Sequence, residues 1–265
     1  MAREADLGHE RDMRFSRFTV FGKHSWGIVT DAGLQPIEES PYEGGEPRPT
    51  GEVIPFEAVR LEVPASPTKI VAIGRNYSEH AKELGNDVPE EPLLFLKPPS
   101  ALLPHEGVIR YPHGMSQLVH HEAELGVVLA RTTRDVSEAD AAAHILGYTL
   151  INDVTARDLQ RKDVQFTRAK GFDTFCPVGP WVDTSFVPGD QRIHLTVNGV
   201  VTQDSTLDHM VFKVPFLVSY ISRIMTLERG DLIATGTPAG VGPLVPGDVV
   251  TVTIDGLGSL TNRVG

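Results

Sequence analysis

The sequence predicts an α+β fold, with a mainly β core, a few helices and a small N-terminal domain. Strand-like runs outnumber helical ones, most connections between them are short, and Gly and Pro mark many of their ends. The chain has 265 residues, 40% of them hydrophobic and 22% charged, which is the composition of an ordinary globular protein. No run of about 18 apolar residues occurs, so we expect no membrane span.

The chain is expected to divide into two domains after a short extension. Residues 1–12 are charged, lack an apolar segment typical of a secretory signal and precede the first strand-like run, so we predict a disordered extension. Residues 13–66 are assigned to a small N-terminal domain, which ends in a Pro-rich linker at 64–67. Residues 67–265 form the expected main domain.

Local patterns predict the elements in order. Asn76, followed by Glu79 three residues later, is typical of a capping box, and the short helix that it starts should end before Gly85. The pair Asn198-Gly199 lies between two short apolar runs and predicts a hairpin turn. We expect strands over 14–20, 25–29, 69–74, 93–96, 120–128, 145–151, 193–197, 200–202, 232–235 and 249–254, and helices over 77–84, 137–143, 155–162 and 211–224.

Charge and cysteine content exclude several classes of protein. The net charge of −11 argues against nucleic-acid binding, which requires clustered Lys and Arg. The single cysteine, Cys176, cannot form an internal disulfide and fits a reducing compartment, so a cytoplasmic location is expected. Cys176 precedes Pro177 with no obvious base nearby, and we expect it in the core.

The stretch from His120 to Val128 is the most informative part of the chain. Residues two apart in a strand project from the same face, so Glu122 and Glu124 should point the same way, with His120 beside them. Two neighbouring carboxylates against an apolar wall stay charged only near a cation, which favours a divalent metal ion. On alternation alone, the polar face of an edge strand is the simpler interpretation.

Asp153 follows the predicted strand 145–151 and can complete a metal site. Three carboxylates form an all-oxygen ligand set, which suits Mg²⁺ or Mn²⁺, with Ca²⁺ as a substitute, better than Zn²⁺. Three protein ligands also leave coordination positions open for a substrate. Asp153 could instead cap the helix that follows it.

Further polar residues are candidates for catalysis. His80 and Glu83 share a helical face, so Glu83 can orient the imidazole as a base for water, although a surface pair has the same spacing. Lys170 stands beside glycine and aromatic residues and can stabilise an oxyanion or enolate. Gln160 lies two helical turns beyond Asp153 and can donate to a substrate oxygen. A solvent-exposed role is the alternative for Lys170 and Gln160.

The segment 235–242, TGTPAGVG, is a glycine-dense turn that follows a predicted strand. Its backbone N–H groups, including that of Gly236, and the Thr237 hydroxyl can form a cradle for a carboxylate. The segment matches neither a P-loop nor a dinucleotide fingerprint, and the chain contains no Gly-x-Ser-x-Gly motif for serine catalysis. The loop 85–92 is a candidate lid.

Together these motifs resemble the fumarylacetoacetate hydrolase superfamily over about residues 69–260. The resemblance rests on ordered motifs: GRNY at 74–77 with His80 and Glu83, FLKP at 95–98, HExELG at 121–126, NDVTARD at 152–158 and TGTP at 235–238. It implies a rolled β-sandwich or barrel-like catalytic domain in a homodimer.

The resemblance also implies roles for individual residues. It implies an Mg²⁺ or Mn²⁺ ion held by Glu122, Glu124 and Asp153. His80 and Glu83 match a water-activating dyad, and Lys170 and Gln160 match residues that stabilise the oxyanion or enolate. The expected substrate-binding residues are Arg75, Tyr77, Gly236 and Thr237.

The function implied is that of a metal-dependent enzyme acting on 2-oxo or 2,4-dioxo acids through a metal-bound enolate. The paired histidines before the Glu-x-Glu motif, with His80 and Glu83, favour an acylpyruvate hydrolase or oxaloacetate decarboxylase. The alternative is a 2-hydroxyhepta-2,4-diene-1,7-dioate isomerase or a fumarylacetoacetate-type hydrolase of aromatic-compound catabolism. A non-catalytic metal-binding fold is the alternative from another class. The only other partner expected is the small-molecule substrate, with neither nucleic acid nor membrane.

Overall fold

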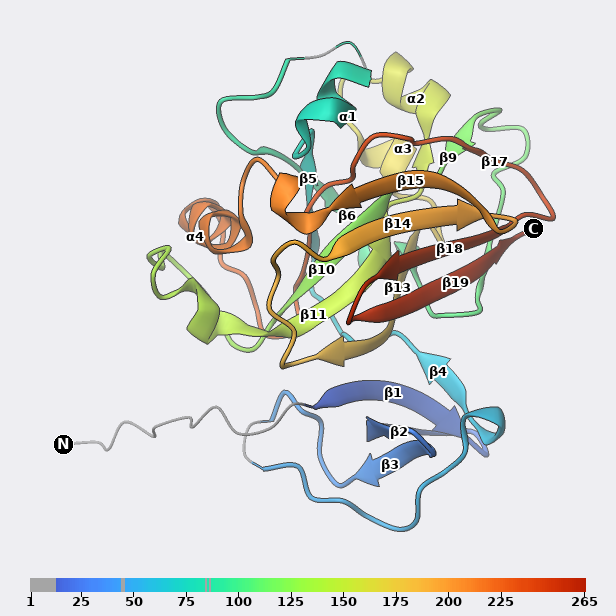
Figure 1. The fold of residues 1–265 in the computed structure, drawn as a ribbon, viewed down its shortest axis with the longest axis vertical. Coiled ribbons are helices and arrows are strands. Elements are labelled where there is room, and N and C mark those ends of the chain that lie inside the picture. Colours follow the sequence, from blue (N-terminus) through green and yellow to red (C-terminus); the bar gives the residue numbers. More distant parts are fainter. Residues whose placement is uncertain (1–12, 44–45, 84, 86) are drawn as a thin grey trace.

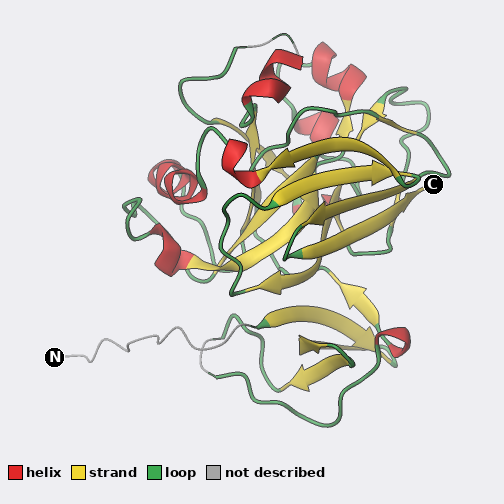
Figure 2. Cartoon of the chain, in the orientation of Figure 1, coloured by secondary structure: helices red, strands yellow, loops and turns green. Residues whose placement is uncertain are grey.

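Strands dominate the computed structural model, which describes residues 13–43, 46–83, 85 and 87–265. They form sheets of eleven, five and three strands, with short helices at the periphery (Figures 1 and 2). None of the helices in these ranges is long and apolar enough to cross a membrane. The extension predicted for 1–12 lies outside the described residues.

The elements have the following bounds. The strands up to the centre of the chain are β1 (Arg14–Val20), β2 (Lys23–Thr30), β3 (Gly33–Ile37), β4 (Arg60–Glu62), β5 (Ile70–Gly74), β6 (Leu93–Lys97), β7 (Leu102–Leu103), β8 (Val108–Ile109), β9 (Val119–His120) and β10 (Ala123–Leu129). They are followed by β11 (Ile145–Asn152), β12 (Thr155–Ala156), β13 (Cys176–Asp183), β14 (Arg192–Val197), β15 (Val200–Thr206), β16 (Leu232–Ala234), β17 (Pro243–Leu244), β18 (Val249–Ile254) and β19 (Gly258–Val264). The α-helices are α1 (Ser78–Glu83), α2 (Arg157–Lys162), α3 (Thr167–Lys170) and α4 (Val214–Ile224).

The largest sheet runs from the N-terminal strands to the centre of the molecule. Its order is β3-β2-β1-β13-β11-β10-β16-β5-β6, with β4 paired to β1 and β7 to β13. Strands β1 to β4 lie apart from the rest at the bottom of Figure 1, and the antiparallel pairing of β1 with β13 joins them to the other strands. A domain boundary at residue 66 stays a prediction.

The main core lies between the central strands of the large sheet and the five-stranded sheet β15-β14-β18-β19-β8. Leu125 and Val127 of β10 and Leu195 of β14 belong to this core and have no exposed surface. A second apolar cluster covers the large sheet near β5, β13 and β16 and includes Cys176, as expected. Burial of this apolar surface is the main stabilising term. The helices α1, α2 and α3 gather at one end of the sheets (Figure 1).

Most expected strands are confirmed, and so is the hairpin. Asn198 and Gly199 have φ values of 51° and 80°, the left-handed conformations that a tight two-residue hairpin turn needs. Strand β13 was missed because Pro177 and Pro180 lie within it, and proline normally indicates against a central strand. Strand β19 was also missed.

Three helix predictions need correction. The helix expected over 137–143 is only a 3₁₀ turn at Ala141–His144, and the helix expected over 155–162 begins as strand β12. Asn76 does not cap α1: its buried side chain donates to the carbonyls of Phe212 and Thr235 and so ties β5 to distant segments. The predicted last residue of that helix, residue 84, lies outside the described residues.

Candidate active site

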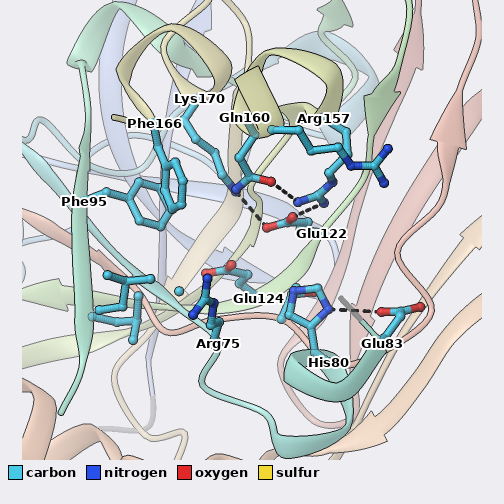
Figure 3. Close-up of a pocket in the computed structure, with 15 residues that line it drawn as sticks. Arg75, His80, Glu83, Phe95, Glu122, Glu124, Arg157, Gln160, Phe166 and Lys170 are labelled. Atoms are coloured by element: carbon cyan, nitrogen blue, oxygen red, sulfur yellow. Dashed lines mark hydrogen bonds and ion pairs between the residues drawn. The ribbon is translucent and has the colours of Figure 1, made fainter. Parts of the chain in front are cut away.

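A cavity of about 360 Å³ opens where α1, α2 and α3 meet the ends of the central strands (Figure 3). This volume is at the lower end of the range of small-molecule sites, which suits a compact ligand. The residues that line it are Ile73, Gly74, Arg75, His80, Glu83, Leu93, Phe95, Glu122, Glu124, Arg157, Gln160, Arg161, Phe166, Lys170 and Thr237. One side of the cavity is apolar and aromatic, and the other side is densely charged.

The three predicted acidic residues converge beside this cavity. One ligand oxygen from each of Glu122, Glu124 and Asp153 lies within 4.8 Å of the other two, and all three residues are buried. The antiparallel pairing of β10 with β11 places Ala123 opposite Asn152, which brings Asp153 next to the Glu-x-Glu segment. The Asp153 N–H donates to the Glu122 carbonyl at 2.8 Å, which holds the two segments together.

The strand that was expected to carry both glutamates is interrupted. His121 and Glu122 lie between β9 and β10, although Glu122 and Glu124 still face the same cavity. His120 was expected beside them, but it pairs with Thr155 and Pro243 in the three-stranded sheet and does not line the cavity.

Cationic side chains surround two of the three carboxylates. Lys170 Nζ lies 2.8 Å from Glu122 Oε2 and 2.5 Å from Asp153 Oδ2, and Arg157 forms an ion pair with Glu122. The buried Lys97 Nζ lies 2.5 Å from Asp153 Oδ1. Burial alone would raise the pKa of Glu122, but the charges of Lys170 and Arg157 outweigh it and hold that pKa well below its usual range. Glu122 therefore stays an anion.

Glu124 has a different environment. Gly236 N–H donates to Glu124 Oε2 at 2.8 Å, and Glu124 forms no ion pair within the described ranges. Burial, followed by the negative charges of Asp153 and Glu122, raises its pKa well above the usual value. A carboxyl group with a raised pKa takes up a proton when no cation is near, and a divalent cation in the cluster would displace that proton. Three buried carboxyl groups, of which Glu124 forms no ion pair within the described ranges, fit a hard divalent cation.

The predicted dyad forms across one turn of α1. His80 Nδ1 lies 3.1 Å from Glu83 Oε2, and the His80 ring lies between Glu83 and the acidic cluster (Figure 3). Because an ionised carboxylate only accepts hydrogen bonds, Nδ1 carries a proton, and in the neutral ring Nε2 is then the nitrogen with the free lone pair. Gly240 N–H donates to the other oxygen of Glu83 at 3.0 Å, so both ends of the carboxylate are held.

The remaining predicted residues divide into two groups. Arg75, Gln160, Lys170 and Thr237 line the cavity, as the sequence suggested for substrate or oxyanion contacts. Tyr77 does not line it: its ring is 2% exposed in the apolar core, and its hydroxyl has no hydrogen-bond partner among the described residues.

The glycine-dense turn at 235–242 binds the protein's own carboxylates. Its N–H groups at Gly236 and Gly240 contact Glu124 and Glu83, so these two groups are not available as a cradle for a substrate anion. Gly240 has a φ of 95°, and a Cβ there would lie 2.1 Å from the Thr202 carbonyl oxygen. Only glycine fits at this position.

Three further cations contribute to the site without having been predicted. Arg157 and Lys97 contact the acidic cluster, and Arg161 lines the cavity. Lys97 ends an otherwise apolar strand, and a lysine in that setting is a sequence signal of a buried ion pair. Arg157 is the first residue of α2 and stands in the NDVTARD motif that also contains Asp153.

Two family models match the chain in succession. The model of the Rv2993c-like N-terminal region matches residues 13–64, and that of the fumarylacetoacetate (FAA) hydrolase C-terminal region matches residues 69–265. The second match covers most of the chain and all the acidic residues of the site.

Characterised and uncharacterised relatives are similar over most of their length. Protein Rv2993c of Mycobacterium tuberculosis is 48% identical over 241 residues, which are 90% of each chain. The mitochondrial oxaloacetate decarboxylase of Dictyostelium discoideum is 47% identical over 196 residues, which are 71% of this chain and 89% of that protein.

Two solved structures are similar in fold. A 2-hydroxyhepta-2,4-diene-1,7-dioate isomerase from Mycobacterium marinum is 42% identical with a TM-score of 0.88, covering 95% of this chain and 98% of that one. A fumarylpyruvate hydrolase from Pseudomonas aeruginosa, in complex with Mn²⁺ and pyruvate, is 35% identical with a TM-score of 0.71 and covers 77% of this chain and 91% of that one.

Proposed function

Because this chain belongs to the fumarylacetoacetate hydrolase family, we propose that it is a divalent-metal-dependent enzyme that breaks a C–C bond in a short 2-oxo acid, by hydrolysis or decarboxylation. One observation carries the proposal: the buried acidic cluster and the His80–Glu83 dyad meet at one small cavity. A cation site and an oriented base, held side by side, are what such a reaction needs.

Glu122, Glu124 and Asp153 would hold the cation. The hard oxygen donors favour Mg²⁺ or Mn²⁺, with Ca²⁺ as a substitute, and Glu124, which forms no ion pair within the described ranges, is left to ionise against the bound cation. When bound, a divalent cation stabilises negative charge that develops on a substrate oxygen. The Mn²⁺ ion in the fumarylpyruvate hydrolase structure supports this choice of metal.

His80 would act as the base. Its Nε2 can take a proton from water, and the resulting hydroxide adds to the distal carbonyl of a 2,4-dioxo acid. Breaking the C3–C4 bond then leaves a carboxylic acid and the enolate of pyruvate, and that enolate is protonated at carbon to give pyruvate. Decarboxylation of oxaloacetate gives the same enolate and CO₂ without added water, so it needs no base for water.

Lys170 and Gln160 would stabilise the enolate oxygen. The Lys170 ammonium contacts two carboxylates and lies 5.0 Å from the centre of the Phe95 ring, so it is fixed at the cavity wall. The oxygen of the Gln160 amide accepts from Arg157 Nη1 at 2.5 Å. Its NH₂ group donates to no described residue and is available to a substrate oxygen.

Two guanidinium groups favour a substrate with a second negative charge. Arg75 and Arg161 line the cavity, and their guanidinium groups form no hydrogen bond or ion pair with the described residues. Arg75 has a φ of 59°, a strained conformation for a residue other than glycine and one often found at functional sites. We therefore place the distal carboxylate of a short dicarboxylic 2-oxo acid near these two arginines.

An isomerase is the second candidate, and one observation favours it. The Mycobacterium marinum isomerase structure covers 95% of this chain, a span that includes its N-terminal strands. In that reaction His80 would move a proton between two carbons of a dienedioate, and no water would add.

A substrate panel separates these functions. The purified chain, loaded with Mn²⁺, is incubated with oxaloacetate, fumarylpyruvate and 2-hydroxyhepta-2,4-diene-1,7-dioate. Pyruvate release and ultraviolet absorbance are then followed together. The proposal predicts pyruvate release that a chelator abolishes. An absorbance change without pyruvate release supports the isomerase, and no turnover of any 2-oxo acid contradicts both.

We further propose a homodimer in the cytoplasm. The family resemblance supports the dimer, and the single buried cysteine supports a reducing compartment. Light scattering on the eluting chromatographic peak tests the dimer directly, with a single-chain mass of 28.9 kDa as the alternative.

A further inference from the structure

The edge strand of the five-stranded sheet carries a buried amide that no catalytic role explains. In β15, Val200, Val201, Thr202 and Asp204 are exposed, whereas Gln203 between them has no exposed surface. The pairing register with β14 shifts here, because Leu195 lies opposite Gln203 and Thr196 opposite Val201. Thr202 is thus an extra residue, and bulges of this kind redirect neighbouring side chains.

Gln203 uses all of its hydrogen-bonding capacity toward the active site. Its Oε1 accepts from the Ala123 N–H at 3.0 Å and lies 3.1 Å from His121 Nδ1. Its Nε2 donates to Thr237 Oγ1 at 2.7 Å and to the Pro238 carbonyl at 2.9 Å. An amide offers two lone pairs and two N–H groups, so all four positions are occupied.

Two of these partners determine which way the amide points. A backbone N–H can only donate and a backbone carbonyl can only accept, so the oxygen faces Ala123 and the nitrogen faces Pro238. His121 must then carry its proton on Nδ1. The Thr237 oxygen accepts from Gln203, and its own hydrogen donates to no acceptor among the described residues. Because Thr237 lines the cavity, that O–H is left for a ligand.

The same amide joins the two segments that build the site. Ala123 lies between Glu122 and Glu124, and Thr237 follows Gly236, whose N–H holds the Glu124 carboxylate. One side chain from a third segment therefore contacts both the acidic segment and the turn at 235–238.

We propose that Gln203 is a positioning residue, which fixes the Thr237 hydroxyl as a hydrogen-bond donor toward the substrate carboxylate and ties it to the acidic segment. This inference rests on the proposed function. Gln203 does not line the cavity, so it acts through Thr237.

The variant Gln203→Glu tests the proposal with little change in shape. When ionised, its carboxylate still accepts from Ala123 and His121, but it can donate neither to Thr237 nor to the Pro238 carbonyl. The Thr237 hydroxyl then donates to residue 203 and is lost to the substrate. The acidic segment keeps its hydrogen bonds, so metal and substrate affinities should respond differently.

The experiment uses calorimetry on the full chain. Mn²⁺ is titrated into metal-free protein, and pyruvate is then titrated into the Mn²⁺-loaded protein. We expect Gln203→Glu and Thr237→Val each to weaken pyruvate binding by about tenfold or more, since a hydrogen bond to a charged group is lost. Both should bind Mn²⁺ within about threefold of the unsubstituted chain. The double variant should bind pyruvate no more weakly than Thr237→Val alone, because the two changes remove the same donor. Asp204→Asn, which weakens an exposed ion pair with Arg192 in the same hairpin, is the control and should leave both affinities unchanged.

Three results would overturn the inference: unchanged pyruvate affinity in Gln203→Glu, losses that multiply in the double variant, or a parallel loss of Mn²⁺ affinity. If the unsubstituted chain and Thr237→Val behave as expected while Gln203→Glu does not, only the inference fails. If the unsubstituted chain binds neither Mn²⁺ nor pyruvate, both the inference about Gln203 and the proposed function fail.

A measurement on the unsubstituted protein covers the case in which Gln203→Glu does not fold. In the Mg²⁺-loaded protein, the Gln203 side-chain NH₂ resonances should exchange slowly with solvent and shift when pyruvate is added. Rapid exchange, or no shift at saturating pyruvate, contradicts the proposal.

Discussion

Replacing Glu124 with glutamine should have opposite effects in the absence and presence of a metal. In metal-free protein the Glu124 carboxylate lies near Glu122 and Asp153, with ligand oxygens within 4.8 Å, and no ion pair compensates it within the described ranges. Glutamine has nearly the same shape and can still accept from Gly236 N–H. We therefore expect Glu124→Gln to stabilise the metal-free fold.

The magnitude follows from the charge separation. Two unit charges about 4.8 Å apart repel by about 3.5 kcal/mol at an effective dielectric constant of about 20. Lys170 offsets part of this repulsion, and proton uptake by Glu124 limits it further. We expect a net gain of about 2 kcal/mol, which raises the melting temperature of a domain of this size by about 4–8 °C.

In the presence of Mn²⁺ the unsubstituted chain should be more stable than Glu124→Gln. A ligand at about 1,000 times its Kd stabilises the protein that binds it by about 4 kcal/mol. The unsubstituted chain should gain this stabilisation on binding Mn²⁺, whereas Glu124→Gln should gain little because one of the three metal ligands has lost its charge. Differential scanning calorimetry with chelator and with Mn²⁺ measures both effects. The exposed Glu57→Gln is the matched control and should change neither value.

Lower stability of Glu124→Gln than of the unsubstituted chain in chelator would contradict this expectation. Glu124 would then be a satisfied structural carboxyl group and not an uncompensated one.

Three further predictions concern other ionisable side chains. His80→Ala should lower the rate of hydrolysis of a 2,4-dioxo acid by about 10²–10⁴-fold, yet leave the rate of oxaloacetate decarboxylation within about tenfold. A coupled pyruvate assay measures both rates, and equal losses would contradict the role assigned to His80. Lys97→Met removes one of the two cations beside the fully buried Asp153. Because Lys170 still pairs with Asp153, the cost in urea unfolding should lie below the about 3–5 kcal/mol of an uncompensated buried charge; a loss below about 1 kcal/mol would show that the pair is dispensable. Burial lowers the pKa of His105, whose Nδ1 accepts a hydrogen bond from the Thr261 N–H. The imidazole therefore takes up a proton from solution more readily in the unfolded chain, and the free energy of unfolding should fall as the pH drops below about 6.5. The urea midpoint should therefore fall less between pH 7.5 and 5.5 in His105→Asn than in the unsubstituted chain, and equal falls would exclude His105 as a source.

The parts of the site that depend on local spacing were predictable from the sequence. The period of a strand indicates that Glu122 and Glu124 share a face, and the period of a helix indicates that His80 and Glu83 do. Both juxtapositions are present in the structure, although Glu122 precedes β10, so the strand period does not by itself account for the first one. The catalytic roles of these residues remain proposals.

The parts that depend on topology were not predictable in the same way. Asn76 has the spacing of a helix cap, yet its partners are Phe212 and Thr235, far away in the chain. Gln203 is one polar residue in a polar strand, and only the bulge and the packing of two sheets bring it to the acidic segment. Local patterns contain no information about such long-range partners, because tertiary contacts determine them.

The proposed metal site is tested most directly by a crystal of this protein grown or soaked with MnCl₂, with diffraction measured at the manganese absorption edge. We expect one anomalous peak coordinated by a carboxylate oxygen from each of Glu122, Glu124 and Asp153, beside His80. A map without a peak among these three side chains, or with the ion held by other residues, would contradict it.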